Sequence, residues 1–387
     1  MESSVTFFPV GNGDMTLVKL ADADKTALLI DCNIRQSADD PDHTDCDVGS
    51  DLRSRISVDA AGRPCIDAFL LSHPDEDHCR GLERHFWLGP IGDYPDDAKA
   101  QKDKRIVIRE ILSSPIVFRR ARKNHALCTD AKAFNKEAKR RVQAYRQYGS
   151  SLKSGDRIRI LGEDENGKTD DLQGILTKQG EIFYGLNNQA QEYFSAALLA
   201  PLRTDDDGAE EQTSKNNSSV IIRISIRNNH ASEFPAYFLT GGDAGVYIWE
   251  RVWDQYSPSE LEYNLLQAPH HCSWRSLSYD SWSMCGEKAA LSEKARDALG
   301  QALSGAMIVS SSKPISDDDA DPPCIRAKRE FKAITQDCNG VFRCTGEHPS
   351  KVKPSPLVLR WTGAQFVAIS AATAAASSAA SAPPRAG

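Results

Sequence analysis

The segment from residue 68 to residue 78 constrains the fold of this chain more than any other. Residues 68–72 (AFLLS) are almost wholly apolar, as expected for a strand covered on both faces. The strand runs directly into residues 73–78 (HPDEDH), and four potential metal ligands fall within these six residues: His73, Asp75, Asp77 and His78. Divalent ions such as zinc and manganese accept imidazole and carboxylate ligands, and a tight loop can turn all four side chains inward. The segment therefore predicts a metal site at the end of a buried strand.

Two later segments repeat this arrangement. Residues 237–240 (YFLT) form an apolar strand that leads into a glycine turn presenting Asp243. Residues 265–273 (LLQAPHHCS) form a third strand and loop, which present His270 and His271. An isolated histidine is more often structural than a ligand, and a polar turn alone would explain one such segment. One shared metal centre is the better interpretation of three strand ends that each deliver His or Asp.

Short apolar strands separated by turns recur along the chain and predict a mixed α/β fold. Further strands are expected at 7–10, 15–20, 26–31, 157–161, 220–225, 306–310, 357–361 and 366–370. The 387 residues are enough for one large domain or two small ones. We expect a single domain over 1–370, with a mobile polar loop at 202–217. Residues 371–387 are rich in Ala, Ser and Pro, which cannot bury a core, so we expect disorder there.

Residues 118–147 have a different character. This segment holds ten Lys or Arg residues against two acidic ones, with Ala, Val, Phe and Tyr at roughly helical spacing. The pattern predicts a helical insertion at about 115–150. Such an excess of cations usually marks a solvated face, but it also suits a surface that guides a phosphate-rich substrate, with residues 139–141 as the densest cluster. The formal net charge of the whole chain, -7, argues against non-specific coating of nucleic acid.

The ten cysteines contain no Cys-x-x-Cys pair, so no structural zinc knuckle is expected. Cys324, Cys338 and Cys344 leave a disulfide framework open as an alternative to free thiols. The first residues lack the basic start and long apolar run of a signal peptide. No stretch approaches the roughly 18 apolar residues that a membrane helix needs. We therefore expect mostly reduced, buried thiols in a cytoplasmic protein without a membrane segment.

Together these motifs resemble the metallo-β-lactamase-fold hydrolases, and within them the hydrolase domain of the ComEC-type competence proteins. The matching segments are VGNGDM (10–15), LLIDCN (28–33), LLSHPDEDH (70–78), SKNNSSVIIRI (214–224), LTGGDA (239–244) and APHHCS (268–273). The resemblance implies a four-layer αβ/βα sandwich, with two mixed sheets packed face to face, helices outside and the metal site at one edge.

The resemblance also implies a role for each residue of the motifs. His73 and Asp75 would face one metal position, Asp77, His78 and His271 the other, and Asp243 would bridge the two. Asp75, Asp77 and His270 would be catalytic, with His270 either a ligand or a donor to a substrate oxygen. Asp31 and Asp14 would orient ligating histidines, although Asp14 could simply cap a turn. Asn216 and Asn217 would contact substrate, or else only contribute polarity to a loop.

The chain also departs from the family pattern. Asp75 stands where the wider superfamily has a second histidine, as in the competence-like branch. Cys272 replaces a usual glycine, and Arg80 replaces the first glycine of the pair after His78. No histidine matches the third ligand position, because His125 lies in the basic segment and His230 lies at the wrong end of its strand. One of the two metal positions thus lacks an expected ligand.

The resemblance favours a metal-dependent phosphodiesterase or nuclease that uses metal-activated water. It would bind one or two Zn²⁺ ions, with Mn²⁺ as the alternative, and act on nucleic acid or another phosphodiester. A hydrolase of a small ester, thioester or lactam is the second interpretation, since this fold supports all three. The third is a partner-binding or regulatory protein that keeps a structural metal cluster.

Overall fold

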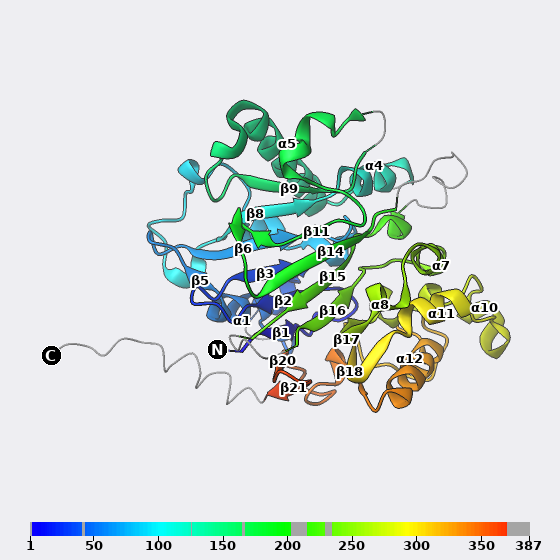
Figure 1. Cartoon of the computed structure of the whole chain (residues 1–387). Coiled ribbons are helices and arrows are strands. Elements are labelled where there is room, and N and C mark those ends of the chain that lie inside the picture. Colours follow the sequence, from blue (N-terminus) through cyan, green and yellow to red (C-terminus); the bar gives the residue numbers. More distant parts are fainter. Residues whose placement is uncertain are drawn as a thin grey trace.

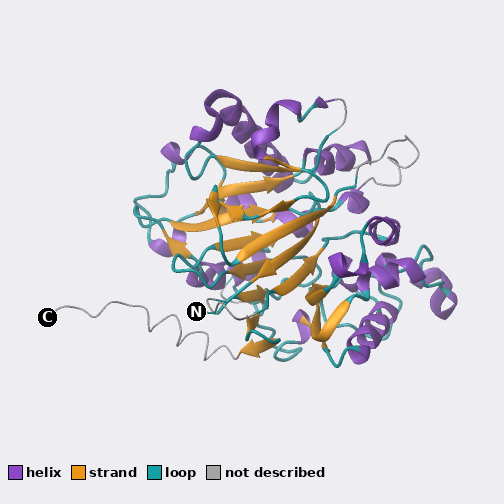
Figure 2. Ribbon diagram, in the orientation of Figure 1, coloured by secondary structure: helices purple, strands orange, loops and turns teal. Residues whose placement is uncertain are grey.

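The computed structural model describes residues 2–40, 43–124, 126–164, 167–202, 215–228 and 234–369. Two β-sheets lie face to face at its centre, and helices cover their outer faces (Figures 1 and 2). The prediction of a four-layer αβ/βα sandwich is therefore confirmed. The tail expected to be disordered, 371–387, and most of the loop expected at 202–217 lie outside the described residues.

The first sheet is mixed and holds eleven strands. In spatial order these are β10 (Leu176–Thr177), β9 (Arg157–Leu161), β8 (Ile106–Ser113), β6 (Pro64–Leu70), β3 (Ala27–Ile30), β2 (Thr16–Lys19), β1 (Ser4–Phe7), β20 (Leu357–Trp361) and β21 (Phe366–Ile369), while β5 (Ser57–Val58) pairs with β6 and β7 (Phe86–Trp87) with β8. Strands β3, β6, β8, β9 and β10 run parallel to one another, whereas β2 is antiparallel to β3. The hairpins β1–β2 and β20–β21 are antiparallel.

The second sheet is also mixed and holds seven strands. In spatial order these are β11 (Ile182–Phe183), β14 (Phe194–Ala200), β15 (Ile221–Ile226), β16 (Ala236–Thr240), β17 (Tyr263–Gln267), β18 (Ala302–Ser310) and β19 (Val341–Cys344). Strands β16 to β19 are parallel, and the others are antiparallel to their neighbours. The short strands β12 (Gly185–Leu186) and β13 (Gln189–Ala190) form a separate pair, and β4 (Cys32–Asn33) bridges to residues 79–80.

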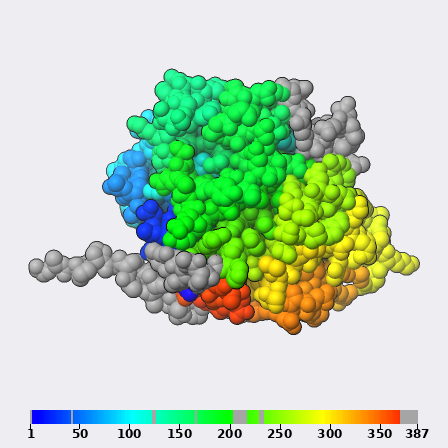
Figure 3. All heavy atoms as spheres, in the orientation of Figure 1, coloured from blue at the N-terminus to red at the C-terminus, as the bar shows by residue number. Residues whose placement is uncertain are grey.

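The helices form the two outer layers. On the side of the first sheet lie α1 (Val48–Arg55), α2 (Glu76–Cys79), α3 (Leu82–His85), α4 (Pro115–Asn124) and α5 (Thr129–Tyr148). On the side of the second lie α7 (Val246–Gln255), α8 (Pro258–Leu261), the short turn α9 (Pro269–Cys272), α10 (Trp282–Cys285), α11 (Glu293–Leu299) and α12 (Ile325–Asp337). In Figure 3 the segment of α5 lies at the top of the molecule and that of α12 at the lower right. Every helix in the described part of the chain is too short or too polar to cross a membrane.

The alternation of side chains along a strand divides the core into layers. Leu28 and Ile30 of β3 belong to the core between the sheets, whereas Leu29 belongs to the core under α5. Across the gap between the sheets, the ring of Phe7 meets that of Phe238 edge to face, with centroids 5.8 Å apart. Strands buried on both faces have little room for polar residues, which explains their apolar sequences.

The carboxyl ends of β6, β16 and β17 meet at one edge of the sandwich. The backbone N–H of Val220, which precedes β15, donates to the carbonyl oxygen of Ser72 after β6, at 2.9 Å. The N–H of His270, after β17, donates to the carbonyl of Gly242, after β16, also at 2.9 Å. The first bond ties the loop after β6 to the segment before β15, and the second ties the loops after β16 and β17 to each other.

The strand predictions at 157–161 and 357–361 match β9 and β20, and the helical prediction for the basic segment matches α4 and α5. The prediction of a first strand at 7–10 is wrong, because β1 ends at Phe7 and residues 8–10 lie in the long loop that joins it to β2. Strands β8 and β14 are not among the predicted strands.

Candidate metal centre

The loop after β6 brings two buried histidines under two partly exposed aspartates. The side chains of His73 and His78 are 1% and 0% exposed, whereas those of Asp75 and Asp77 are 26% and 34% exposed. The helix α2 begins directly after Asp75, so Asp77 and His78 lie in its first turn. The histidines thus form the floor of the site and the aspartates its mouth.

Asp243 lies between the other side chains. Its Oδ1 is 3.0 Å from Nε2 of His78 and 3.4 Å from Nε2 of His271. Its Oδ2 is 3.6 Å from Nε2 of His73 and 3.5 Å from Nε2 of His270. The two oxygens of one carboxylate therefore face two different pairs of histidines.

Each pair of histidines has an aspartate of the 73–78 loop beside it. Asp75 Oδ2 lies 3.7 Å from Nε2 of His73, and Asp77 Oδ2 lies 3.4 Å from Nε2 of His271. The result is two neighbouring sets of nitrogen and oxygen atoms that share Asp243. All six residues predicted as metal ligands, and His270, are brought together here: His73, Asp75, Asp77, His78, Asp243 and His271.

The turn α9 aims two adjacent histidines into the site at the cost of backbone strain. His270, His271 and Cys272 all have positive φ, at 51°, 53° and 68°. Residues with a Cβ rarely adopt this left-handed conformation, and it costs about 1–3 kcal/mol for each one that does. In the family that the motifs resemble, the position of Cys272 holds a glycine. The positive φ of Cys272 explains that preference, because glycine adopts such a φ without strain. Strain of this kind is typical of functional sites.

Asp31 holds His78 in place from beneath. Its Oδ2 lies 2.8 Å from Nδ1 of His78, while Oδ1 accepts a hydrogen bond from the backbone N–H of Ser72 at 2.7 Å. The hydroxyl of Ser72 also donates to Asp31 Oδ2, at 2.6 Å. A carboxylate at this nitrogen keeps a proton on Nδ1, so Nε2, which faces Asp243, is the nitrogen left to bind a metal ion. Ser72 is not singled out by the sequence, where a serine ending an apolar strand carries no distinctive signal.

Asp14 lies beside Nδ1 of His271, at a longer distance than Asp31 from His78 and without hydrogen-bond geometry. Its Oδ1 lies 3.4 Å from Nδ1 of His271, and its Oδ2 lies 3.8 Å from Nδ1 of His78. The carboxylate is buried, with 3% of the residue exposed. Ligand atoms of Asp14, His78, Asp243 and His271 all lie within 4.8 Å of one another. Asp14 is therefore part of the cluster, rather than only the cap of a turn.

Several buried polar atoms of the cluster face one another without hydrogen-bond geometry. Within the described part of the chain, the atoms without a hydrogen bond include Nε2 of His73, His78 and His271, and Oδ1 of Asp243. A buried polar atom left without a partner costs about 1–3 kcal/mol, so a group of them around one point calls for a ligand. A divalent cation accepts imidazole nitrogen and carboxylate oxygen together. The residues present fit a metal ion, and this cluster can bind one.

The charges of the cluster favour a cation at its centre. Burial opposes ionisation of Asp243, but His270, His271 and the two other histidines outweigh it and hold the pKa of Asp243 well below its usual range. Burial also opposes protonation of His78 and His271, yet the neighbouring carboxylates raise the pKa of His78 well above its usual value and that of His271 to about 10. A divalent ion would supply the positive charge that these protons otherwise provide, so its binding would release protons.

At His270, burial outweighs the neighbouring carboxylate. Burial lowers the pKa of His270, and Asp243 opposes this only in part. The side chain of His270 is 18% exposed, more than those of the other three histidines. His270 is therefore the histidine of the cluster that a ligand entering the site can reach most easily.

The remaining candidate residues have different outcomes. Nδ2 of Asn216 lies 3.5 Å from Oδ2 of Asp243, so this amide is at the site. The side chain of Asn217, and the whole of His125 and His230, lie outside the described residues. All ten cysteines are free thiols, including Cys324, Cys338 and Cys344.

The densest basic cluster of the sequence, residues 139–141, does not form one charged surface. Arg141 is 1% exposed and donates to Glu137 at 2.7 Å. Arg140 donates to Glu137 and to Asp156, at 2.7 and 2.8 Å. Two of the three residues are thus engaged within the protein, and a guiding role of the basic segment stays a prediction. Lys139 is exposed.

Comparisons with known proteins add little to this geometry. A scan against models of known protein families found no match, and neither did a search of curated proteins. A search of solved structures matched a long form RNase Z from yeast, with 9% sequence identity and a TM-score of 0.31. The match covers 68% of this chain and 32% of that one, so the chain spans about a third of the length of the matched structure. The assignment of the fold rests on the two sheets and their helical layers.

Proposed function

We propose that this chain is a metal-dependent hydrolase of the metallo-β-lactamase fold, and that it cleaves phosphodiesters. The observation that carries the proposal is the position of Asp243, whose two oxygens face two sets of histidine nitrogens. Neighbouring sets of donors that share one carboxylate suit two metal ions, and paired ions are common in enzymes that cleave phosphate esters.

The ligand assignment follows these two sets. His73, Asp75 and His270 would hold one ion with Oδ2 of Asp243, and Asp77, His78 and His271 the other with Oδ1. His270 would then take the third ligand position of the family, at which the sequence motifs offer no histidine. Zinc suits this mixture of nitrogen and oxygen donors, and manganese is the alternative. When bound, such an ion acts as a Lewis acid and makes water a nucleophile near neutral pH.

Other residues of the chain would prepare the site for this chemistry. Asp31 and Asp14 would keep the protons of His78 and His271 on Nδ1 and so keep Nε2 available. Asn216 would orient a substrate oxygen, because its amide lies beside Asp243 and its Oδ1 is buried without a hydrogen bond to the described residues. Asp75 and Asp77, at the exposed mouth, would accept a proton from an attacking water.

The preference for phosphodiesters over small esters rests on two features. The motifs resemble the competence-like branch of the superfamily, which is associated with nucleic-acid processing. In addition, β8 pairs with β6 in parallel, and a cation-rich segment follows β8 at the edge of the sheet where β6 delivers the metal ligands. In α4 itself, Arg119 is paired with Asp164 and Arg120 is buried, so the resemblance carries most of this preference.

The test measures metal content and hydrolysis of bis(p-nitrophenyl) phosphate by the whole chain, with and without a chelator. Asp77→Ala combined with His78→Ala should lose bound metal and hydrolysis together, while a thermal melt shows that the fold remains. A control pair, Asp337→Ala with His348→Ala, removes the same residue types away from the cluster and should change neither readout. Full metal content in the Asp77/His78 variant would refute the ligand assignment. Bound metal without phosphodiester hydrolysis, but with hydrolysis of p-nitrophenyl acetate, would refute the substrate class.

A further inference from the structure

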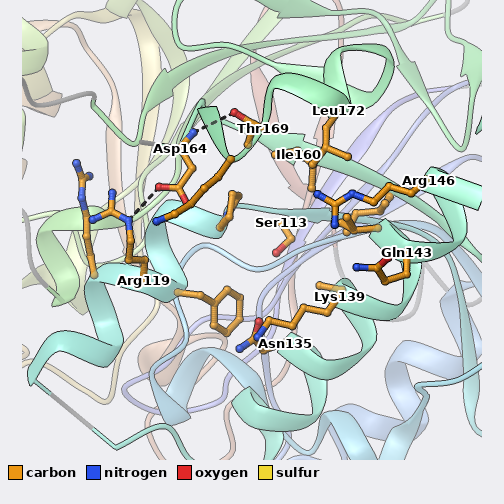
Figure 4. Close-up of a pocket in the computed structure, with 17 residues that line it drawn as sticks. Ser113, Arg119, Asn135, Lys139, Gln143, Arg146, Ile160, Asp164, Thr169 and Leu172 are labelled. Carbon is orange, nitrogen blue, oxygen red and sulfur yellow. Dashed lines mark hydrogen bonds and ion pairs between the residues drawn. The ribbon is translucent and has the colours of Figure 1, made fainter. Parts of the chain in front are cut away.

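A cavity lies between α5, α4 and the outer face of β9, and no residue of the metal cluster lines it (Figure 4). Its volume is about 920 Å³, which is within the range of pockets that bind small molecules. Nothing in the proposed hydrolysis uses this cavity. Its lining therefore points to a ligand of its own.

The floor of the cavity is apolar and partly aromatic. Phe118, Ile160 and Leu172 line it and are buried, with 6%, 3% and 4% of each residue exposed. The ring of Phe118 stacks on that of Phe134, with centroids 6.0 Å apart and an angle of 14° between the planes. A flat aromatic ligand packs well against such a surface, because base–aromatic stacking contributes about 1–3 kcal/mol.

One polar side chain in this apolar surface has no partner among the described residues. Asn135 of α5 lines the cavity and is only 6% exposed, yet its amide makes no hydrogen bond to any other residue that the structure describes. Within the described part of the chain, the atoms of this amide are not among the fully buried polar atoms without a partner, so they are open to the cavity. The amide offers a donor and an acceptor side by side, which is the pattern that Asn presents to the edge of a nucleobase.

The rim of the cavity carries an excess of positive charge. Its lining includes five Lys or Arg residues and one acidic residue, Asp164. Arg119 is bound to Asp164 at 2.9 Å, and Arg146 to Asp171 at 2.6 Å. Lys139 is exposed and forms no ion pair with any residue in the described ranges. Its ammonium group is therefore available to an anion.

These features follow one face of α5. Asn135, Lys139 and Gln143 are spaced four residues apart, so they lie one above another along the helix and all face the cavity. Figure 4 shows them in a row beside Arg146. The order along the helix is a buried amide, then a free cation, then an exposed amide.

We propose that this cavity is a binding site for a nucleoside monophosphate. The base lies against Phe118 with its polar edge on the Asn135 amide, and the phosphate lies at the rim beside Lys139. A fatty acid would leave the amide without a partner, and inorganic phosphate would leave the apolar floor unused. The proposal does not depend on the activity of the metal cluster, because the two sites share no residues.

Calorimetric titration of the whole chain with AMP, GMP, CMP and UMP tests the proposal, with the four nucleosides and inorganic phosphate as partial ligands. At least one nucleotide should bind more tightly than its nucleoside and more tightly than phosphate. Asn135→Leu should weaken that nucleotide roughly tenfold. Lys139→Gln should weaken it roughly fivefold and leave nucleoside binding unchanged.

Two controls separate binding in the cavity from binding elsewhere on the chain. Lys136→Gln removes the same charge from an exposed position of α5 outside the cavity and should leave binding unchanged. The Asp77→Ala, His78→Ala variant should also bind the nucleotide normally, which excludes binding at the metal cluster. The proposal is overturned if no nucleotide binds at about 1 mM, the weak end of useful affinity. It is equally overturned if Asn135→Leu and Lys139→Gln both leave binding unchanged, or if phosphate alone binds as tightly as every nucleotide.

Discussion

Replacement of Asp31 by asparagine tests how the buried aspartate prepares His78 for a metal ion. In the wild-type chain, Asp31 accepts a hydrogen bond from the N–H of Ser72 through Oδ1 and contacts Nδ1 of His78 through Oδ2, at 2.7 and 2.8 Å. Burial raises the pKa of Asp31, but the contact with His78 opposes this and favours the ionised form. Asparagine keeps the shape and the volume of this side chain and removes its charge.

Neither orientation of the new amide can satisfy both neighbours. If its oxygen stays on the N–H of Ser72, its NH₂ group faces Nδ1 of His78 and drives the imidazole proton to Nε2, the atom that points at Asp243. If the amide is reversed, its NH₂ group opposes the N–H of Ser72. A charge-assisted hydrogen bond is lost either way, which costs about 1.5–3 kcal/mol. Asp31→Asn should therefore bind zinc roughly 10- to 100-fold more weakly.

Competition with a chromophoric zinc chelator measures this change. Asp67→Asn is the matched control, because Asp67 also accepts a backbone N–H, from Ala27, and binds Arg109 at 2.7 Å, but lies outside the cluster. The control should bind zinc as the wild type does. Wild-type zinc affinity in a folded Asp31→Asn variant would refute the reasoning, since His78 would then need no carboxylate to act as a ligand.

Three more buried positions give predictions of their own. Arg141→Met should destabilise the chain by about 3 kcal/mol in urea unfolding, because it leaves the buried carbonyl groups of Ile108 and Arg157 without this donor and leaves Glu137 paired with Arg140 alone. Gly242→Ala should weaken zinc binding in the same competition assay, since Gly242 has a φ of +49° and a Cβ there would lie 2.6 Å from the hydroxyl oxygen of Ser72. Burial lowers the pKa of His85 from 6.5 to about 4, so the unfolded chain takes up this proton first and stability falls as the pH drops through that window. His85→Gln should remove that part of the loss in pH-dependent melts.

Strands β8 and β14 could not be predicted from the sequence, and each has an identifiable reason. In β14 the residues FSAALLA are mostly good helix formers, and only pairing with β11 and β15 makes them a strand. In β8 the apolar run is interrupted by Arg109 and Glu110. The carboxylate of Glu110 is buried and accepts a hydrogen bond from the N–H of Asn187, a contact that no local pattern can indicate. Where a strand carries an uninterrupted apolar run, as β20 does, its bounds can be read directly.

The candidate site is more predictable than the fold around it, because its ligands follow strand ends and carboxyl ends of strands gather at sheet edges. The sequence therefore predicts that Asp243 and the histidines lie together, as they do, but it cannot show which oxygen of Asp243 faces which histidine. It also leaves the role of Asp14 open, since a carboxylate after Gly-Asn-Gly reads equally well as part of a turn. Its contact with His271 joins residues far apart in the chain and exists only once the two sheets pack.

The basic segment shows why a count of charges is a poor guide to a binding surface. Positions 137, 140 and 141 lie on one side of α5, so a single glutamate pairs with both Arg140 and Arg141. Lys139 lies on the side of the helix that faces the cavity, together with Asn135. Reversing the charge of residues 139–141 together would unpair Glu137 and destabilise the helix, and this loss would be mistaken for lost binding. Of the three residues, Lys139 alone can be changed without that consequence, so it is the position at which ligand binding and stability can be measured separately.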